Sequence, residues 1–330
     1  MDKKLVLLGM GGTIAGTAKV AGDNVGYTAG QVPVAQLLEA VPTVSGLLKR
    51  GAIVAEQVCQ IDSKDLVDGD WFALTARVVH HLAQDDVQSI VVTHGTDTIE
   101  ETAYWLTRLI PGSDLARKPV VLTCAMRPAS ALTPDGPANM ADAVAVAMSP
   151  GARGVVVVCA GKIHSAAHVQ KVHPYRVDAF DSGEAGPIGV IEEGRVRLLT
   201  EWPRTDIGNP VVNWTALQLS RLPRVELLAS HAGASGAVVR SLLTPAQGDA
   251  PLRGLVVMGT GNGTVHKELE QALRMALAQG IRVARVSRCG YGAVVQATRA
   301  TTAVDFPVYA LSAVKARIAL MLDIAAADLG

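Results

Sequence analysis

This sequence of 330 residues has few aromatic residues and no excess of charge of either sign. Aromatic side chains make up 4% of the chain and do not cluster with Lys or Arg, so the pattern offers no surface on which nucleic-acid bases could stack. The 30 basic residues are matched by 30 acidic ones, which argues against a polyanion-binding protein. Hydrophobic residues make up 49%, enough to bury a sizeable core, and this excludes a disordered chain.

Long hydrophobic runs are also missing. A membrane helix needs about 20 apolar residues in succession, whereas the longest candidate run here is VVVVCA, residues 155–160. The first apolar run, Leu5 to Leu8, ends at Gly9, short of the roughly 7–15 residues of a signal-peptide core. We therefore predict a cytoplasmic protein with neither a membrane nor a nucleic-acid partner.

Cysteine and histidine patterns predict neither disulfides nor a metal site. The chain has four cysteines and eight histidines. The cysteines are widely spaced, three lie inside apolar runs, and none belongs to a CxxC pair, so we expect buried free thiols in a reducing compartment. The histidines are scattered and form no HExxH motif, so we expect no metal ion. The cysteines are Cys59, Cys124, Cys159 and Cys289.

Short runs rich in Val, Ile and Leu alternate with helical patterns, as is typical of a mostly parallel α/β sheet. The HGTD motif is followed by apolar residues at helical spacing, and Thr98 with Glu101 fits a capping box, so a helix is predicted to begin there. Two further helices are predicted at Glu268–Ala278 and Val314–Ala325. The predicted strands are Leu5–Leu8, Ser89–Thr93, Pro119–Cys124, Gly154–Cys159, Leu255–Met258 and Arg282–Val286.

The length of the chain predicts two lobes, because a single hydrophobic core stops growing at roughly 250–300 residues. The stretch EWPRTDIGNPVVNWTALQLSRLPR carries three prolines and few strand signals, and the strand-like run VELLAS follows it. We therefore place an N-terminal lobe at residues 1–203, a linker at 204–224 and a C-terminal lobe at 225–330.

Ligands of open parallel sheets bind at the carboxyl ends of the strands, and the first such loop here is GMGGTIAG, Gly9 to Gly16. A dinucleotide fingerprint would need glycine where Ile14 stands, and a P-loop would need lysine where Thr17 stands, so both nucleotide sites are disfavoured. The glycines allow close approach of a ligand to the backbone, with the Thr13 hydroxyl available beside it. The alternative is that Thr13 is a turn residue that caps the following segment.

The second loop, in THGTDTIEETAYWL, places Thr96 and Asp97 between a strand and a helix. Backbone N–H groups at a helix start can hold a developing oxyanion, and a carboxylate there suits a substrate ammonium group. Asp97 could instead cap the helix, but the predicted capping box already assigns that role to Thr98. We therefore favour a functional role for Asp97.

Other chemistry-bearing residues are ambiguous when each is taken alone. Asn262, in the glycine-rich loop GTGNG, fits an ordinary turn residue. Lys171, in HVQKVHPYR, fits a solvated surface lysine. A serine-hydrolase nucleophile elbow, GxSxG, is absent, because GASGA at residues 233–237 has its glycine one place early.

Together the loops resemble those of the bacterial-type L-asparaginase/glutaminase family. GGTIAG near the start, THGTDT followed by EETAYWL, AMRP (Ala125–Pro128) with DGP (Asp135–Pro137), GNG, and a last helix containing KAR occur in the family's order. The resemblance covers nearly the whole chain. It implies a two-lobed α/β fold: a larger N-terminal, flavodoxin-like mixed sheet with helices on both faces, and a smaller C-terminal parallel α/β lobe.

The resemblance also implies an activity and an assembly. The expected reaction is hydrolysis of the side-chain amide of L-asparagine to L-aspartate and ammonia, with minor glutaminase activity and without a metal or organic cofactor. The expected assembly is a homotetramer in which the C-terminal lobe completes a neighbouring subunit's site. In this resemblance Asn262 corresponds to a residue that the neighbouring subunit donates.

The resemblance assigns roles to residues of the N-terminal lobe. Thr13 corresponds to the nucleophile, and Tyr27 to its hydrogen-bonding partner on a flexible lid. A second polar triad corresponds to Thr96, Asp97 and Lys171. Ser63 corresponds to the serine that holds the substrate α-carboxylate, and Asp97 also binds the α-amino group. A lysine beside a threonine can act as a base when it is partly desolvated, which agrees with these residue types.

Two positions depart from the family pattern. Lys64 stands where many members carry a glutamine that touches the substrate. The segment RCGYGAVVQATRATTAV contains no glutamate, although the family usually has one there to support the substrate ammonium. Arg299 falls at or near that place and is expected to point away from the pocket, and Asp305 is the alternative carboxylate. We therefore expect weaker recognition of the substrate ammonium.

Two other functions stay open. One is the amidotransferase subunit that acts on charged tRNA, which normally carries an extra amino-terminal module, whereas GGTIAG begins here at Gly11. The other is an amino-acid-binding protein on the same fold that has lost catalysis. Release of ammonia from free asparagine separates both from an asparaginase.

Overall fold

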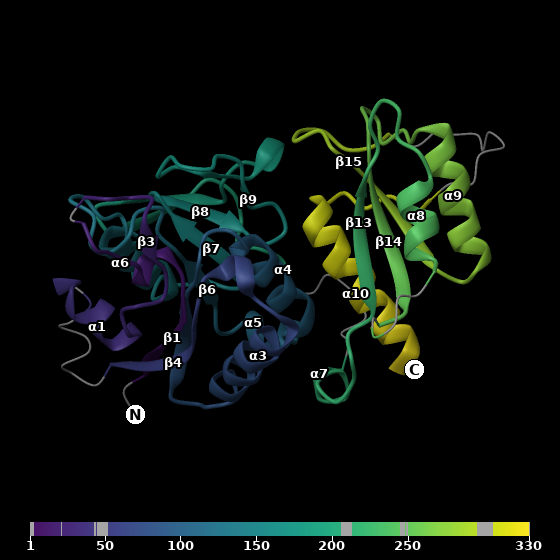
Figure 1. The fold of residues 1–330 in the computed structure, drawn as a ribbon. Helices are drawn as coiled ribbons and strands as arrows, with labels where there is room; N and C mark the ends of the chain where they lie inside the picture. Colours follow the sequence, from purple (N-terminus) through teal and green to yellow (C-terminus); the bar gives the residue numbers. More distant parts are fainter. Residues whose placement is uncertain are drawn as a thin grey trace. The chain divides into compact units, whose positions relative to one another are not determined.

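The structure is a computed structural model of the chain, and it describes residues 3–20, 22–42, 44, 52–205, 213–244, 248, 250–295 and 306–329. Arg299 and Asp305 lie outside these described residues. The chain divides into two compact units, Met1–Asn209 and Pro210–Gly330, and each unit contains its own main sheet (Figure 1).

Unit 1 is built on an eight-stranded mixed sheet with the order β12-β11-β8-β7-β6-β5-β1-β4. Neighbours from β4 to β7 pair in parallel, and those from β7 to β12 pair antiparallel. The parallel part has the doubly wound order of flavodoxin, which confirms the predicted sheet. The strands are β1 (Lys4–Gly11), β4 (Ile53–Ile61), β5 (Val87–Thr93), β6 (Val120–Thr123), β7 (Val155–Cys159), β8 (Lys162–Ser165), β11 (Gly189–Glu192) and β12 (Arg195–Leu198).

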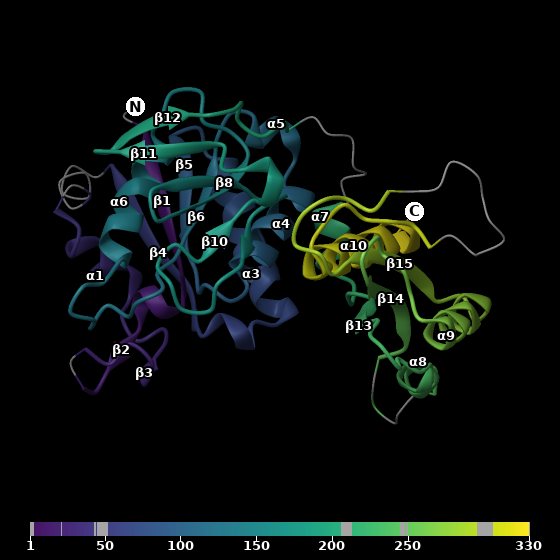
Figure 2. The same cartoon turned by 90° about the horizontal axis from the view of Figure 1, so that it is seen from above.

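Helices cover both faces of this sheet, as predicted, with α1 and α6 on one side and α3 and α4 on the other (Figure 2). The strands between them are apolar and buried at nearly every position, which is what a parallel sheet covered on both faces requires. On the α3–α4 side, the rings of Trp71 and Trp105 stack with centroids 5.0 Å apart. The helices are α1 (Val34–Glu39), α3 (Asp68–Leu82), α4 (Ile99–Leu109), α5 (Gly112–Leu115) and α6 (Gly136–Ala147).

Short elements outside the main sheet carry several of the predicted site residues. Among the described residues, strands β2 (Thr17–Ala18) and β3 (Tyr27–Thr28) pair only with each other, and we call residues 17–20 and 22–28 the lid. Strands β9 (Gln170–Lys171) and β10 (Phe180–Asp181) form a second small ribbon. The 3₁₀ turns are η1 (Thr13–Ala15), η2 (Ser63–Asp65) and η3 (Gly183–Ala185).

Unit 2 is a smaller parallel α/β lobe, as predicted. Its sheet has the order β13-β14-β15, and both pairings are parallel. Helix α10 packs on one face and α8 and α9 on the other (Figure 1). The strands are β13 (Arg224–Ala229), β14 (Leu252–Gly259) and β15 (Arg282–Ser287), and the helices are α7 (Trp214–Leu217), α8 (Ala237–Leu242), α9 (Lys267–Ala278) and α10 (Ala313–Leu329).

All four cysteines are free, as predicted. Cys124 and Cys159 are buried as predicted and Cys59 is partly buried, but the prediction of burial is wrong for Cys289, which is exposed in the loop after β15. Across the described part of the chain, no helix combines the length and the apolar character that a bilayer crossing needs.

Candidate active site

The predicted site residues of unit 1 gather where strands β1 and β5 end. These strands are parallel neighbours, with Gly9 opposite Thr93, so the loops that follow them lie at the same edge of the sheet. The chain leaves β1 for β4 on one side and reaches β5 on the other, which makes this the point where the strand order reverses. Ligands of doubly wound sheets bind at such a point.

Two glycines allow the loops after β1 and β5 to touch. A Cβ atom at Gly12, which has φ 83°, would lie 2.3 Å from the Cα atom of Gly95. A Cβ atom at Gly95 would lie 2.5 Å from the Ser63 hydroxyl oxygen. A side chain at either position would therefore push apart the loops that carry Thr13, Ser63 and Thr96.

The first polar pair is Thr13 and Tyr27. The hydroxyl oxygens of the two side chains lie 2.6 Å apart, a short and well-formed hydrogen bond. Thr13 is buried in η1, whereas Tyr27 is half-buried on the lid. The structure therefore brings together the two residues predicted as nucleophile and partner.

The second polar group is Thr96, Asp97 and Lys171. The Lys171 ammonium donates to the Thr96 hydroxyl at 2.9 Å and to the Asp97 carboxylate at 2.5 Å. The Lys171 backbone N–H donates to the Glu100 carboxylate at 3.3 Å, which ties β9 to the first turn of α4. The Lys171 side chain is 17% exposed and that of Asp97 49%, so the lysine is partly desolvated while the carboxylate faces solvent.

Ser63 is buried beside this group and links η2 to the second loop. Its hydroxyl accepts the Asp97 backbone N–H at 3.2 Å, and its carbonyl accepts the Thr98 hydroxyl at 2.9 Å. The predicted capping box is therefore wrong: Thr98 occupies the N-cap of α4 but makes no side-chain capping bond. The physical reason is that the Ser63 carbonyl, distant in the sequence, engages the Thr98 hydroxyl instead.

A buried network that the sequence analysis missed supports the second loop from behind. The Thr102 hydroxyl accepts from Trp71 Nε1 at 2.9 Å and lies 2.9 Å from His94 Nε2. A carbonyl oxygen only accepts, so His94 Nδ1 carries the imidazole proton and donates it to the Gly95 carbonyl at 2.8 Å. The Thr102 hydroxyl then donates its proton to His94 Nε2. Burial lowers the pKa of His94 to about 4, so the ring is neutral and holds this loop carbonyl in place. The only sequence signal is a histidine between a buried strand and glycine.

Asn262 belongs to unit 2, and its amide is engaged within that unit. The Nδ2 group donates to the Val295 carbonyl at 2.8 Å, and Oδ1 accepts the Val295 backbone N–H at 2.7 Å. The side chain therefore fastens the GTGNG loop to residue 295, and its predicted contribution to a neighbouring subunit stays a prediction.

Lys64 departs from the family pattern and turns toward acidic neighbours. Its ammonium pairs with Asp65 and lies 3.7 Å from an Asp62 carboxylate oxygen. The hydrogen bond to Asp65 raises the pKa of Lys64, so the lysine carries its charge at neutral pH.

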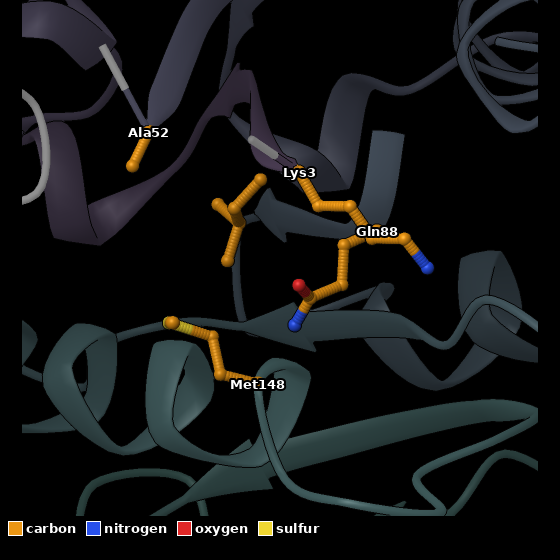
Figure 3. A pocket seen from close by; sticks show the side chains of 5 residues that line it. Lys3, Ala52, Gln88 and Met148 are labelled. Atoms are coloured by element: carbon orange, nitrogen blue, oxygen red, sulfur yellow. The ribbon is translucent and has the colours of Figure 1, made fainter. Parts of the chain in front are cut away.

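Two cavities in unit 1 lie apart from these polar groups. One, of about 20 Å³, is at the amino ends of the strands (Figure 3) and has room for about one water molecule. The other, of about 150 Å³, lies beside Ile14 and is lined mostly by apolar residues at the end of α1 and just after it, in the loop that precedes α6, and in the first turns of α6. Within the described ranges, no group of three His, Cys, Asp or Glu side chains is arranged to hold a metal ion.

Comparison with known proteins relates both units to one family. Residues 4–204 match the model for the N-terminal domain of asparaginase, and residues 224–328 match the glutaminase/asparaginase C-terminal domain. L-asparaginase 2 of Bacillus subtilis is 36% identical over 290 residues, which cover 87% of this chain and 73% of that protein. The glutaminase-asparaginase of Pseudomonas aeruginosa is 35% identical over 295 residues, which cover 88% and 77%.

A solved structure agrees with these relatives over the whole chain. The "Probable Cytoplasmic L-asparaginase" of Campylobacter jejuni superposes with a TM-score of 0.86 at 33% identity, covering 99% of this chain and 98% of that one. The two matched domains, the identities and the shared fold agree with the polar groups at the ends of β1 and β5. The chain belongs to the asparaginase family.

Proposed function

We propose that this protein hydrolyses the side-chain amide of L-asparagine to L-aspartate and ammonia through a threonine nucleophile, with a minor activity toward L-glutamine. The observation that carries the proposal is the meeting of two polar groups at one sheet edge: Thr13 with Tyr27 at 2.6 Å, and Thr96 with Lys171 at 2.9 Å. Each group pairs a threonine hydroxyl with a side chain that can accept or relay its proton.

In the first step the Thr13 oxygen attacks the amide carbon, and its proton passes through the hydrogen bond to Tyr27 toward the leaving nitrogen. Ammonia leaves, and an ester joins the Thr13 oxygen to the aspartyl carbonyl. The negative charge that develops on the carbonyl oxygen needs donors. The Thr96 backbone N–H is a candidate donor to this oxygen, because it forms no hydrogen bond among the described residues.

In the second step water attacks the ester, which releases aspartate and returns the proton to Thr13. The Thr96 hydroxyl, in contact with Lys171, is placed to relay the water proton. Lys171 donates to this hydroxyl and fixes its orientation. The exposed side of Asp97 is available to the substrate ammonium.

The substrate backbone groups have candidate partners in the same loops. The Ser63 hydroxyl lies within hydrogen-bond distance of the Asp97 N–H, so a carboxylate held by Ser63 and an ammonium held by Asp97 would be neighbours, as they are in an α-amino acid. This spacing supports an amino-acid substrate over a simple amide.

We also propose a homotetrameric assembly, a cytoplasmic location and a reaction without a cofactor. The assembly rests on the correspondence of Asn262 with a residue given to a neighbouring subunit, and the location on the four free cysteines and the structural relative described as cytoplasmic. Light scattering of the active enzyme tests the assembly, and a fully active monomer would overturn it.

The test of function is product release from free amino acids. Wild-type protein is incubated with L-asparagine or L-glutamine, and ammonia and the acidic amino acid are measured together in buffer treated with a metal chelator. Equal amounts of ammonia and aspartate support the proposal. Binding of asparagine without ammonia would favour the amino-acid-binding protein, and ammonia release only in the presence of charged tRNA would favour the amidotransferase subunit.

A further inference from the structure

The lid is attached to the rest of unit 1 at few points. Its two strands pair with each other and not with the main sheet, and near its tip Val20 is 67% and Val25 76% exposed. Within the described part of the chain, two hydrogen bonds join the lid to residues outside it and its hinges. One is the bond between Tyr27 and Thr13, so some other contact must hold the lid before Tyr27 can be in place.

The second of these hydrogen bonds involves Ser130. Its hydroxyl accepts the backbone N–H of Ala18 at 2.8 Å, across 112 positions of the sequence. Ala18 is the residue paired directly with Tyr27 across the lid hairpin. The contact at Ser130 therefore fixes the strand position opposite the tyrosine.

Ser130 lies in a loop that is itself well anchored, residues 126–135, which we call the docking loop. The Asp135 carboxylate accepts the backbone N–H groups of Met126 and Arg127, both at 2.9 Å. The Arg127 guanidinium in turn donates to the Thr133 hydroxyl at 2.6 Å. The acceptor that meets the lid is therefore held in place independently of the lid.

Two more contacts place the docking loop along the lid. The Ala129 backbone N–H donates to the carbonyl of Gly16, at the lid hinge, at 2.9 Å. At the other end, a Cβ atom built on Gly22 would lie 3.5 Å from the Leu132 side chain. The loop thus follows the lid from hinge to tip, and Ser130 makes the side-chain hydrogen bond between them.

We propose that Ser130 is a positioning residue that latches the lid closed and thereby holds Tyr27 against Thr13. It touches neither Thr13 nor Tyr27 in any hydrogen bond of the structure, so it acts through the lid. A single neutral hydrogen bond shifts an equilibrium by about two- to tenfold. Its loss is therefore expected to raise the open population of the lid by that factor and leave the chemistry of the closed state intact.

The lid contains a natural reporter of its opening. Lys19 follows Ala18 directly and is exposed, but trypsin must pull the surrounding segment out of the hairpin to cleave it, so the cleavage rate follows the open population. Cleavage after Lys19 is measured on the full-length protein by mass spectrometry of the N-terminal fragment. Only variants whose melting temperature equals that of the wild type are compared.

The experiment compares three variants. Ser130→Ala removes the acceptor, Ser130→Thr retains the hydroxyl, and Ser113→Ala removes an exposed hydroxyl of α5, outside both the docking loop and the lid. We expect cleavage after Lys19 to be about two- to tenfold faster in Ser130→Ala and unchanged in the other two. If Ser130→Ala does not fold, Ser130→Cys, with a weaker acceptor, replaces it.

The kinetic part of the test rests on the proposed function, and the proteolysis does not. We expect kcat/KM for asparagine to fall about two- to tenfold in Ser130→Ala, mainly through a higher KM, and to be restored in Ser130→Thr. Equal cleavage rates in wild type and Ser130→Ala would overturn the latch. If the wild-type protein releases no ammonia but Ser130→Ala is still cleaved faster, the proposed function is overturned and the latch is retained.

Discussion

The two polar groups of the site are supported in different ways. Thr96 is 5% exposed, and its loop is held by the buried His94–Thr102–Trp71 network. Tyr27 instead sits on a two-residue strand of an exposed lid. One half of the site is therefore built on the core of the sheet, and the other half depends on the lid for one of its two side chains. Variants of the rigid half should change the chemistry, and variants of the lid should change how often the site is complete.

The largest expected effect comes from Thr13, where the two halves meet. Thr13→Ala removes the proposed nucleophile and should lower kcat for asparagine at least about a hundredfold, as the loss of an essential catalytic group does. Thr17→Ala, on the lid strand, is the matched control and should stay within about twofold of wild type. Near-native turnover by Thr13→Ala would remove the nucleophile assignment.

A comparable loss is expected in the rigid half. Lys171→Ala should lower kcat about a hundredfold by removing the partner of Thr96, and Lys171→Arg should not restore it, because a guanidinium differs in shape and stays charged. Trypsin cleavage after Lys19 should be unchanged in both variants, since the lid is untouched. Full activity of Lys171→Ala would exclude the second group from catalysis.

The free energy of unfolding should depend on pH through His94, which supports the loop of Thr96. Burial lowers the folded-state pKa of His94 to about 4, whereas the unfolded chain has the ordinary value of about 6.5. Between these values the unfolded state binds the extra proton, so this group destabilises the fold as pH falls. From pH 7 to pH 5 it should cost about 2 kcal/mol of unfolding free energy.

Urea unfolding at pH 7 and pH 5 measures this loss, and the His94→Gln variant, which has no titrating ring, should show a smaller one. Asp142, whose pKa burial raises to about 6, acts in the opposite sense, because its folded form takes up a proton as pH falls. Its contribution is present in both proteins and cancels in the comparison. An equal loss in wild type and variant would contradict the buried neutral histidine.

The smallest effect is expected in the lid half. Tyr27→Phe keeps the ring but removes the hydroxyl that bonds Thr13, and kcat/KM should fall about tenfold, the equivalent of one hydrogen bond made in the transition state. Lid opening, measured by cleavage after Lys19, should rise at the same time because one of the two tethers is lost. A Tyr27→Phe variant with unchanged kinetics would show that the lid serves only to exclude water.

Local pattern was sufficient for the parts of the fold that are buried and regular. The apolar runs at β1, β6 and β7 are buried along nearly their whole length, so their composition alone identified them. Strand β12 has no such signal, because RVRL is largely exposed and is held by its pairing with β11. The resemblance, rather than pattern, pointed to Lys171, Ser63 and Tyr27 as site residues.

The failures have a common cause, which is a partner far away in the sequence. Thr98 has the local pattern of a cap, but the Ser63 carbonyl takes its hydroxyl. His94 has no pattern that distinguishes it, because its role depends on Thr102 and Trp71 in two different helices. Ser130 has no distinguishing sequence pattern, because its partner Ala18 is 112 positions away in the sequence.

The nucleophile is identified most directly by finding which threonine carries the aspartyl group. The Lys171→Ala variant, in which the proposed second step is slowed, is mixed with asparagine, quenched in acid and digested with trypsin. We expect an aspartyl ester on the peptide of residues 5–19, at Thr13, formed together with ammonia. An ester on the peptide that carries Thr96, or asparagine turnover by Thr13→Ala at the wild-type rate, would contradict this assignment.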